Sequence, residues 1–297
     1  MGEIAALATA VCWALSSVFF TATTKEIGAL AVNRIRLVFA VVFLLITHTL
    51  LTGRPLPLGV APSHWLWLGL SGIVGLVIGD TLLFQAFKLI GNRLGTLIMA
   101  GVPVMSGLGA WLFLSEKLAP QAILGIAICV CGIGVVVFER AGANTPLNAD
   151  RRRYITGILY ALGGALGQAG GLILAKMGLN DNFPSISGVM IRMLVALLVM
   201  WAFTLLTGQA RATLGKFLQN RQTTLNLIAG SLVGPFIGVW LSQIAVQNSY
   251  VGISSTLMAM TPIVMLPIAR YYYLEKLSPR VLFGTLLALA GVTVIFL

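Results

Sequence analysis

One segment of this chain occurs twice, and both copies lie in apolar stretches long enough to cross a lipid bilayer. The copies share the pattern Pro…Glu-Lys-Leu-x-Pro…Gly…Gly and are displaced by 159 residues (262 minus 103). The matched residues are Pro103, Glu116, Lys117, Leu118, Pro120, Gly125 and Gly132, followed by Pro262, Glu275, Lys276, Leu277, Pro279, Gly284 and Gly291. Duplicated halves inside a membrane are a common construction of transporters, so the repeat favours transport over catalysis.

The composition requires a lipid environment. Of 297 residues, 58% are hydrophobic and only 9% are charged, with a mean hydropathy of +0.98, whereas a soluble domain carries about 25% charged residues. The net charge of +11 does not indicate nucleic-acid binding, because the basic residues lie in short gaps between apolar stretches. We therefore expect a multi-pass protein of the cytoplasmic membrane that interacts with the bilayer and a small-molecule substrate.

Apolar runs divide the chain into two similar halves. A spanning helix needs about 20 largely apolar residues, and such runs occur at 3–22, 30–51, 64–87, 94–115, 119–138, 155–177, 185–207, 225–247, 251–273 and 279–297. The expected parts are a first repeat (1–139), a basic cytoplasmic linker (140–154) and a second repeat (155–297). Because each half crosses an odd number of times, the sequence predicts an all-α membrane protein with ten transmembrane helices in two inverted five-helix repeats.

The basic residues predict an orientation in the membrane. Fifteen of the 19 Lys and Arg residues lie in or beside the gaps after helices one, three, five, seven and nine. Cytoplasmic loops carry the excess of Lys and Arg, so this side should be cytoplasmic. Both chain termini are then expected outside.

The doubled segment resembles the end of the repeat in the EamA family of the drug/metabolite transporter superfamily. Trp13-Ala-Leu-Ser-Ser in helix one, and Ala86 and Ala245 late in helices three and eight, extend the resemblance over the whole chain. The resemblance implies export or exchange of a metabolite by alternating access, through a central cavity between the halves, and leaves the substrate open. Many members keep their termini in the cytoplasm, and the charges of this chain indicate the reverse.

The repeated motif has separable parts. Pro103 and Pro262 lie near the middle of predicted helices four and nine, where proline kinks a helix; we interpret them as cavity-lining hinges, with a static packing kink as the alternative. Glu-Lys-Leu-x-Pro is typical of a helix-turn-helix connection. The paired glycines lie two turns apart and permit close helix contact, within the chain or in a homodimer, so the protein is expected to be a monomer or a homodimer.

Asp80 is the one acidic residue well inside a predicted span. A carboxylate there needs a partner or water, which makes Asp80 a candidate for function. Arg34 and Arg36 lie at a similar depth, so a structural ion pair with either is one interpretation and a proton- or cation-linked gate is the other. In the second half Val239 aligns with Asp80, while Arg192 retains the arginine.

Polar and aromatic side chains inside the spans are candidates for lining a substrate cavity. A glutamine in hydrocarbon needs partners, so it faces either another helix or a cavity. The candidates are Trp13, Ser16, Gln85, Gln168, Trp240 and Gln243.

These features predict a secondary transporter for a small polar metabolite, such as an amino acid or related compound. A transporter or flippase for a lipid-linked, sugar or nucleotide substrate is the first alternative, and a membrane-embedded enzyme is the remote one. The chain has only two histidines, His48 and His64, without acidic sequence neighbours, and no GxxxxGK[ST] motif. We expect no catalytic residues, no metal and no cofactor.

Overall fold

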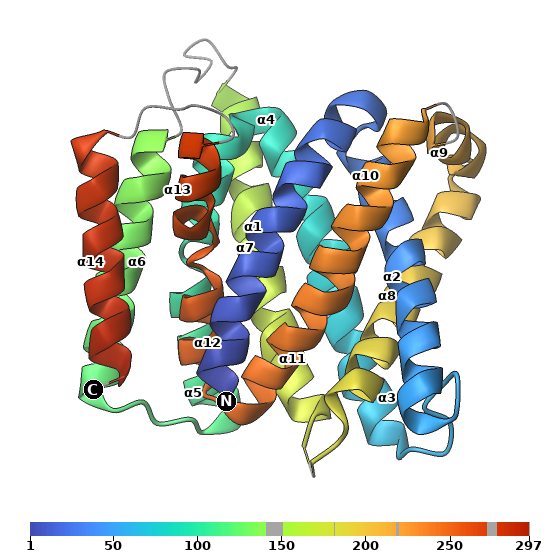
Figure 1. The fold of residues 1–297 in the computed structure, drawn as a ribbon, viewed down its shortest axis with the longest axis horizontal. Helices are drawn as coiled ribbons and strands as arrows, with labels where there is room; N and C mark the ends of the chain where they lie inside the picture. Colours follow the sequence, from blue (N-terminus) through green and yellow to red (C-terminus); the bar gives the residue numbers. More distant parts are fainter. Residues whose placement is uncertain (141–150, 181, 218–219, 272–277, 297) are drawn as a thin grey trace.

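The structure, a computed structural model, describes residues 1–297 except 141–150, 181, 218–219, 272–277 and 297. Helices form a bundle in which both chain termini lie at the same end (Figure 1). The first half contains α1 (Gly2–Ile27), α2 (Ala29–Thr52), α3 (Pro62–Ser71), the π-helix η1 (Gly72–Gly79), α4 (Asp80–Met99), α5 (Val102–Leu114) and α6 (Pro120–Arg140). The second half contains α7 (Arg151–Gly178), α8 (Ser185–Leu206), α9 (Ala210–Phe217), α10 (Arg221–Ser231), the π-helix η2 (Leu232–Gly238), α11 (Val239–Asn248), α12 (Val251–Met258), α13 (Thr261–Tyr271) and α14 (Pro279–Phe296).

Eight stretches in the described part of the chain are long and apolar enough to cross a membrane. They cover the predicted spans except the fourth and the tenth, which correspond to the shorter apolar helices Val102–Leu114 and Pro279–Ile295. The prediction of an all-helical membrane protein is therefore confirmed, with eight candidate spans by length and composition.

Both copies of the repeated proline begin a helix. The helical path is interrupted at Ala100–Gly101 before α5 and at Ala259–Met260 before α13, which are repeat-equivalent positions. Pro103 and Pro262 are each the second residue of the helix that follows. Proline is tolerated there because the first backbone N–H groups of a helix have no intrahelical acceptor. The mid-helix kinks expected at these prolines are instead breaks between two helices, and the break at Ala259–Met260 lies inside the candidate span Val251–Ile268.

The π-helices η1 and η2 also occupy equivalent places in the two halves. Each lies inside the third predicted span of its own half, 64–87 for η1 and 225–247 for η2. Each carries the sequence Val-Gly-x-x-Ile-Gly, as Val74–Gly79 and Val233–Gly238. Pro235 in η2 aligns with Leu76 in η1, so the wide turns do not require proline. π-Helical turns are rare and are frequently found at functional sites.

The first helix of each half packs against the π-helix of the other half. A Cβ atom at Gly167 of α7 would lie 2.7 Å from the Cα of Gly79 in η1. A Cβ at Gly234 of η2 would lie 2.7 Å from the Oγ of Ser16 in α1. The absence of side chains at these glycines lets the helices touch, and the two halves are thereby interleaved.

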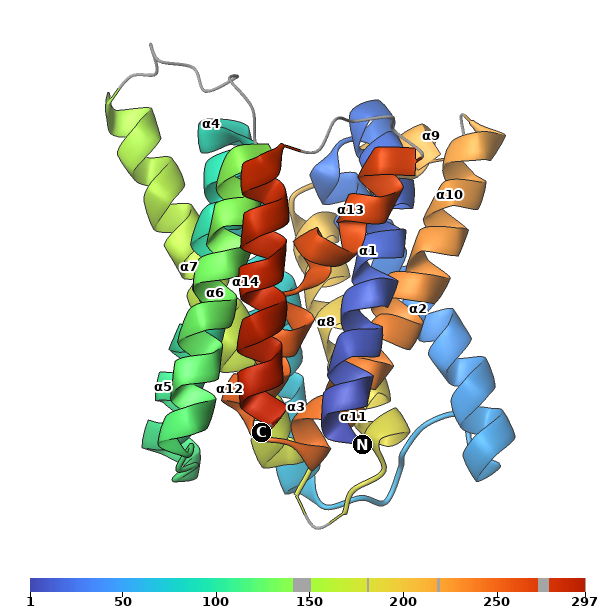
Figure 2. The ribbon, with the colours of Figure 1, turned by 60° about the vertical axis from the view of Figure 1, so that its left-hand side comes forward.

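Helices α6 and α14, the last helix of each half, lie side by side (Figures 1 and 2). A Cβ at Gly284 would lie 2.9 Å from the carbonyl oxygen of Gly132, and a Cβ at Gly125 would lie 2.9 Å from that of Gly291. The repeated glycines thus face each other within one chain. The glycine faces are therefore buried against each other within the chain, and the expectation of a monomer or a homodimer stays a prediction.

Candidate functional site

A carboxylate held by both halves lies in the interior of the bundle. Asp80 is the first residue of α4, directly after η1, and it forms an ion pair with Arg36 of α2. Gln168 of α7 donates a hydrogen bond from Nε2 to the Asp80 Oδ1 at 2.6 Å. Asn33 accepts a hydrogen bond from the Arg36 Nε at 2.8 Å. Asp80 therefore connects α2 and α4 of the first half with α7 of the second.

The glycines around Asp80 explain how Gln168 reaches it. A Cβ at Gly79 would lie 3.4 Å from the backbone nitrogen of Gln168. Because neither Gly79 nor Gly167 carries a side chain, α7 approaches the end of η1 closely enough for a direct amide–carboxylate hydrogen bond. Trp13, which aligns with Gln168 between the halves, occupies the matching place against η2: a Cβ at Gly238 would lie 3.0 Å from its Cδ1.

Arg34 does not take part in the Asp80 cluster. Its guanidinium donates to the Oε1 of Gln209 at 2.6 Å and to the Oγ1 of Thr213 at 3.0 Å, at the start of α9. Of the two arginines predicted as partners for Asp80, the structure pairs Arg36 and turns Arg34 toward α9.

Arg192 of α8 is buried, with 3% of its surface exposed. Its guanidinium lies over two glycines: a Cβ at Gly75 would be 2.9 Å from Nη2, and a Cβ at Gly171 would be 3.4 Å from it. Asp80 attracts Arg192 electrostatically, but the ion pairs found within the described ranges do not include Arg192. Its Nε is buried and has no hydrogen-bond partner there.

Of the other predicted lining residues, Ser16, Trp240 and Gln243 lie around η2 and α11, and Gln85 lies on α4. Ser16 is buried against Gly234, and its hydroxyl donates to the carbonyl of Trp13. Trp240 packs on Phe236, with ring centroids 6.1 Å apart. Among the described residues, the indole N–H of Trp240 and both amide atoms of the fully buried Gln243 have no hydrogen-bond partner. Gln85 is half-buried on α4.

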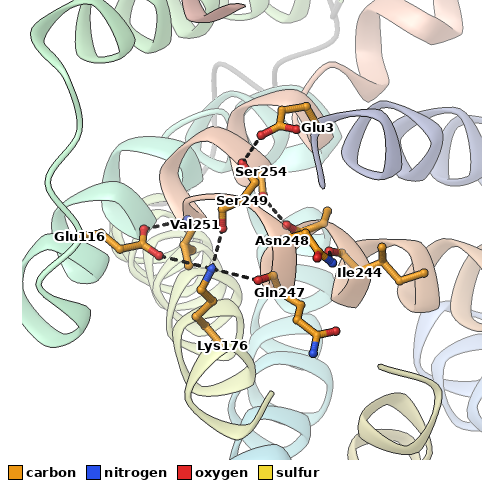
Figure 3. Close-up of polar contacts among 10 residues, drawn as sticks. Glu3, Glu116, Lys176, Ile244, Gln247, Asn248, Ser249, Val251 and Ser254 are labelled. Atoms are coloured by element: carbon orange, nitrogen blue, oxygen red, sulfur yellow. Dashed lines mark hydrogen bonds and ion pairs between the residues drawn. The ribbon is translucent and has the colours of Figure 1, made fainter. Parts of the chain in front are cut away.

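A second polar network, called the terminal network below, lies at the terminal end of the bundle, which is the end where both chain termini lie (Figure 3). Glu116 accepts a hydrogen bond from the backbone nitrogen of Val251 at 2.8 Å, and its other oxygen lies 3.7 Å from the Nζ of Lys176. Lys176 donates to the carbonyl of Ser249 at 2.7 Å, and the Ser249 hydroxyl donates to Glu3 at 2.7 Å. The network caps the end of α11 and the start of α12, and it joins the two halves.

Sequence reasoning missed this network. It assigned Glu116 to a helix connection, where the residue lies, but Lys176 was not among the candidate site residues, and the structure places Lys176 between helix ends beside Glu116 and Ser249. The repeat-equivalent residue of Glu116, Glu275, lies outside the described residues. The duplicated Val-Gly-x-x-Ile-Gly was also overlooked, although it is visible in the sequence and would have located η1 and η2.

Comparisons with known proteins agree with this two-part construction. The sequence model of the EamA-like transporter family matches residues 1–138 and 155–297. A search of curated proteins gave no match. Among 29 matching solved chains, one crystal structure, described only as that of a protein, is similar with a TM-score of 0.79. Its identity is 16% over 99% of this chain and 95% of that one, so the likeness shows the fold alone. The chain belongs to the EamA-like transporter family, within the drug/metabolite transporter superfamily.

Proposed function

We propose that this protein is a secondary transporter that carries a small polar metabolite across the cytoplasmic membrane by alternating access. In this proposal ten helices cross the membrane as two inverted five-helix repeats, with the chain termini outside. Membership in a transporter family supports transport over catalysis. The observation that carries the proposal is the interior carboxylate of Asp80, which is bonded across the interface between the two halves.

Two sets of polar contacts cross this interface at different heights. Gln168 bonds Asp80, and Lys176 approaches Glu116, eight residues further along the same helix; at 1.5 Å per residue the two contacts are about 12 Å apart. Water can replace polar partners when the halves separate at one end. The proposed cycle opens one set of contacts at a time, while the apolar contact of α6 with α14 stays closed.

The proposed role of Asp80 is to hold the halves together in one state and to release Gln168 in another. An ionised carboxylate accepts a strong hydrogen bond and pairs with a guanidinium, whereas an amide in its place keeps the shape and loses the charge. We expect Asp80→Asn to abolish transport and Asp80→Glu to retain part of it.

Purified protein reconstituted in liposomes tests the proposal. A counterflow screen with amino acids, sugars, nucleotides and organic anions measures movement of unmodified substrate. Asp80→Asn, Asp80→Glu and the parent protein are compared at equal amounts of monodisperse protein. Full transport by Asp80→Asn at every pH would exclude an ionised role for Asp80. Chemical conversion of the substrate instead of movement would contradict transport.

A further inference from the structure

The described interior of the bundle contains more positive than negative charge. Asp80 is 8% exposed, Arg34 is 6% exposed and Arg192 is 3% exposed, and Arg36 is partly buried beside Asp80. Asp80 neutralises Arg36 through their ion pair. Arg34 is solvated by the neutral Gln209 and Thr213 at the start of α9. Arg34 and Arg192 both lack a carboxylate partner in the described part of the chain, but Arg34 has neutral hydrogen-bond acceptors, whereas no hydrogen bond from the Arg192 guanidinium is found there.

A buried cation of this kind is unfavourable unless something compensates it. Breaking a buried ion pair by removing one partner costs about 3–5 kcal/mol, because an uncompensated charge remains. Charged residues inside membrane helices typically mark substrate or ion pathways. In the first half Asp80 compensates the positive charge of Arg36. The position equivalent to Asp80 in the second half is the apolar Val239, which cannot compensate Arg192.

The structure holds the Arg192 guanidinium in a defined place. Its Nη2 lies beside Gly75 of η1 and Gly171 of α7, where side chains would displace it. Gly171 is three residues, or about 4.5 Å of helix rise, from Gln168, which bonds Asp80. The guanidinium is therefore set next to the Asp80 cluster and within its electrostatic reach.

We propose that Arg192 binds a carboxylate group of the transported metabolite; this inference rests on the function proposed above. A planar guanidinium matches a carboxylate through two parallel hydrogen bonds. Asp80, Arg36 and Arg192 together carry one excess positive charge, which one carboxylate neutralises. A phosphate monoester carries about −1.5 to −2 charges at pH 7. The negative charge beyond the first unit would not be neutralised and would be repelled by Asp80. The site therefore favours a metabolite with a single carboxylate at this end.

Acetate, the smallest carboxylate probe, tests the site by binding rather than by transport. The melting temperature of the full-length protein in lipid nanodiscs is titrated with sodium acetate and, separately, with acetamide, at constant ionic strength set with sodium chloride. Acetate should stabilise the parent protein more than acetamide does. Arg192→Gln should weaken acetate binding by roughly tenfold or more, because a charge-assisted hydrogen-bonding partner is lost.

Further variants keep the test decisive if Arg192→Gln does not fold. Arg192→Lys should retain part of the acetate effect, and Gly75→Ala should weaken it by displacing the guanidinium while leaving its charge. Asp80→Asn should strengthen acetate binding, since the competing anion is removed, although the same variant should abolish transport. Arg54→Gln, at an exposed loop arginine, is the matched control and should behave like the parent protein.

The outcomes separate this inference from the proposed function. Equal stabilisation by acetate and acetamide, or an acetate effect that Arg192→Gln or Gly75→Ala leaves unchanged, would overturn the carboxylate site even if the liposomes transport a neutral or cationic compound. An acetate effect that depends on Arg192 supports the site even if the counterflow screen finds no substrate.

Discussion

The third predicted spans of the two halves share a backbone design and differ in charge. Each contains a π-helix over Val-Gly-x-x-Ile-Gly, and each receives the first helix of the opposite half at the glycines. Asp80 follows η1 and pairs with Arg36, whereas Val239 follows η2 and Arg192 has no carboxylate partner in the described residues. Features common to both halves build the scaffold, and the proposed chemistry rests on the residues that differ between them.

The largest expected effect is the loss of stability when Arg36 is replaced, and it is to be compared with the replacement of Arg192. Arg36→Met leaves Asp80 buried without its partner and should destabilise the protein by about 3–5 kcal/mol. Arg192→Met removes a cation that lacks such a partner and should leave the ligand-free stability unchanged or raised. Thermal unfolding in nanodiscs without added organic anion measures both. An equal loss of stability in the two variants would contradict the difference between Arg36, which has a carboxylate partner, and Arg192, which has none in the described residues.

The shared scaffold can be disturbed separately from the charges. Gly132→Ala places a methyl group against the backbone of α14, at Ala288, and should cost about 1–3 kcal/mol of stability through forced separation of the helices. Gly134→Ala is the control on the same helix, because a Cβ there meets nothing within 4 Å. Acetate affinity should not change in either variant, and a selective loss of affinity in Gly132→Ala would argue against a purely scaffolding role.

Weakening the terminal network should have a smaller effect on stability than the changes above. Glu116→Gln keeps an acceptor for the Val251 N–H but loses the attraction to Lys176, so closure of the terminal end should weaken by about 1 kcal/mol. The expected result is faster exchange of backbone amides near Ser249 and Val251, followed by hydrogen–deuterium exchange mass spectrometry. Lys117→Gln, at the exposed neighbouring residue, should show the parent pattern. Unchanged exchange in Glu116→Gln would remove this network as a gate.

The smallest expected effect concerns Gln243, which takes the place of Phe84 in the other half. Arg36 lies over the Phe84 ring at 5.9 Å, while the Gln243 amide is buried and unpartnered within the described structure. Gln243→Met should change stability by less than about 1 kcal/mol, since no hydrogen bond is lost. Reduced counterflow at unchanged stability would assign the amide to the substrate, and normal counterflow would assign Gln243 to packing.

The sequence was sufficient to predict an all-helical membrane protein and its family, because both depend on patterns along the chain. Apolar runs gave the membrane helices, and the repeated motif gave the EamA resemblance that the family match confirms. The breaks before Pro103 and Pro262 were assigned as kinks instead, since proline in an apolar run is compatible with either.

Partners across helices were less predictable. Arg34 and Arg36 are both possible partners of Asp80 by depth, but their side chains point in different directions around α2, and the rotation of a helix is set by its neighbours. Lys176 and Glu116 illustrate the same limit: they are 60 residues apart, and only the approach of α7 to the α5–α6 connection brings them together.

The contact of α6 with α14 has a consequence for biogenesis. Synthesis proceeds from the N-terminus, so α6 enters the membrane long before α14, which ends at Phe296, has left the ribosome. Until then the glycine face of α6 is covered by lipid or by another chain. The glycine face of α6 is therefore buried only once α14 has been made and inserted, and truncation before Pro279 should leave a chain that inserts but remains open to degradation.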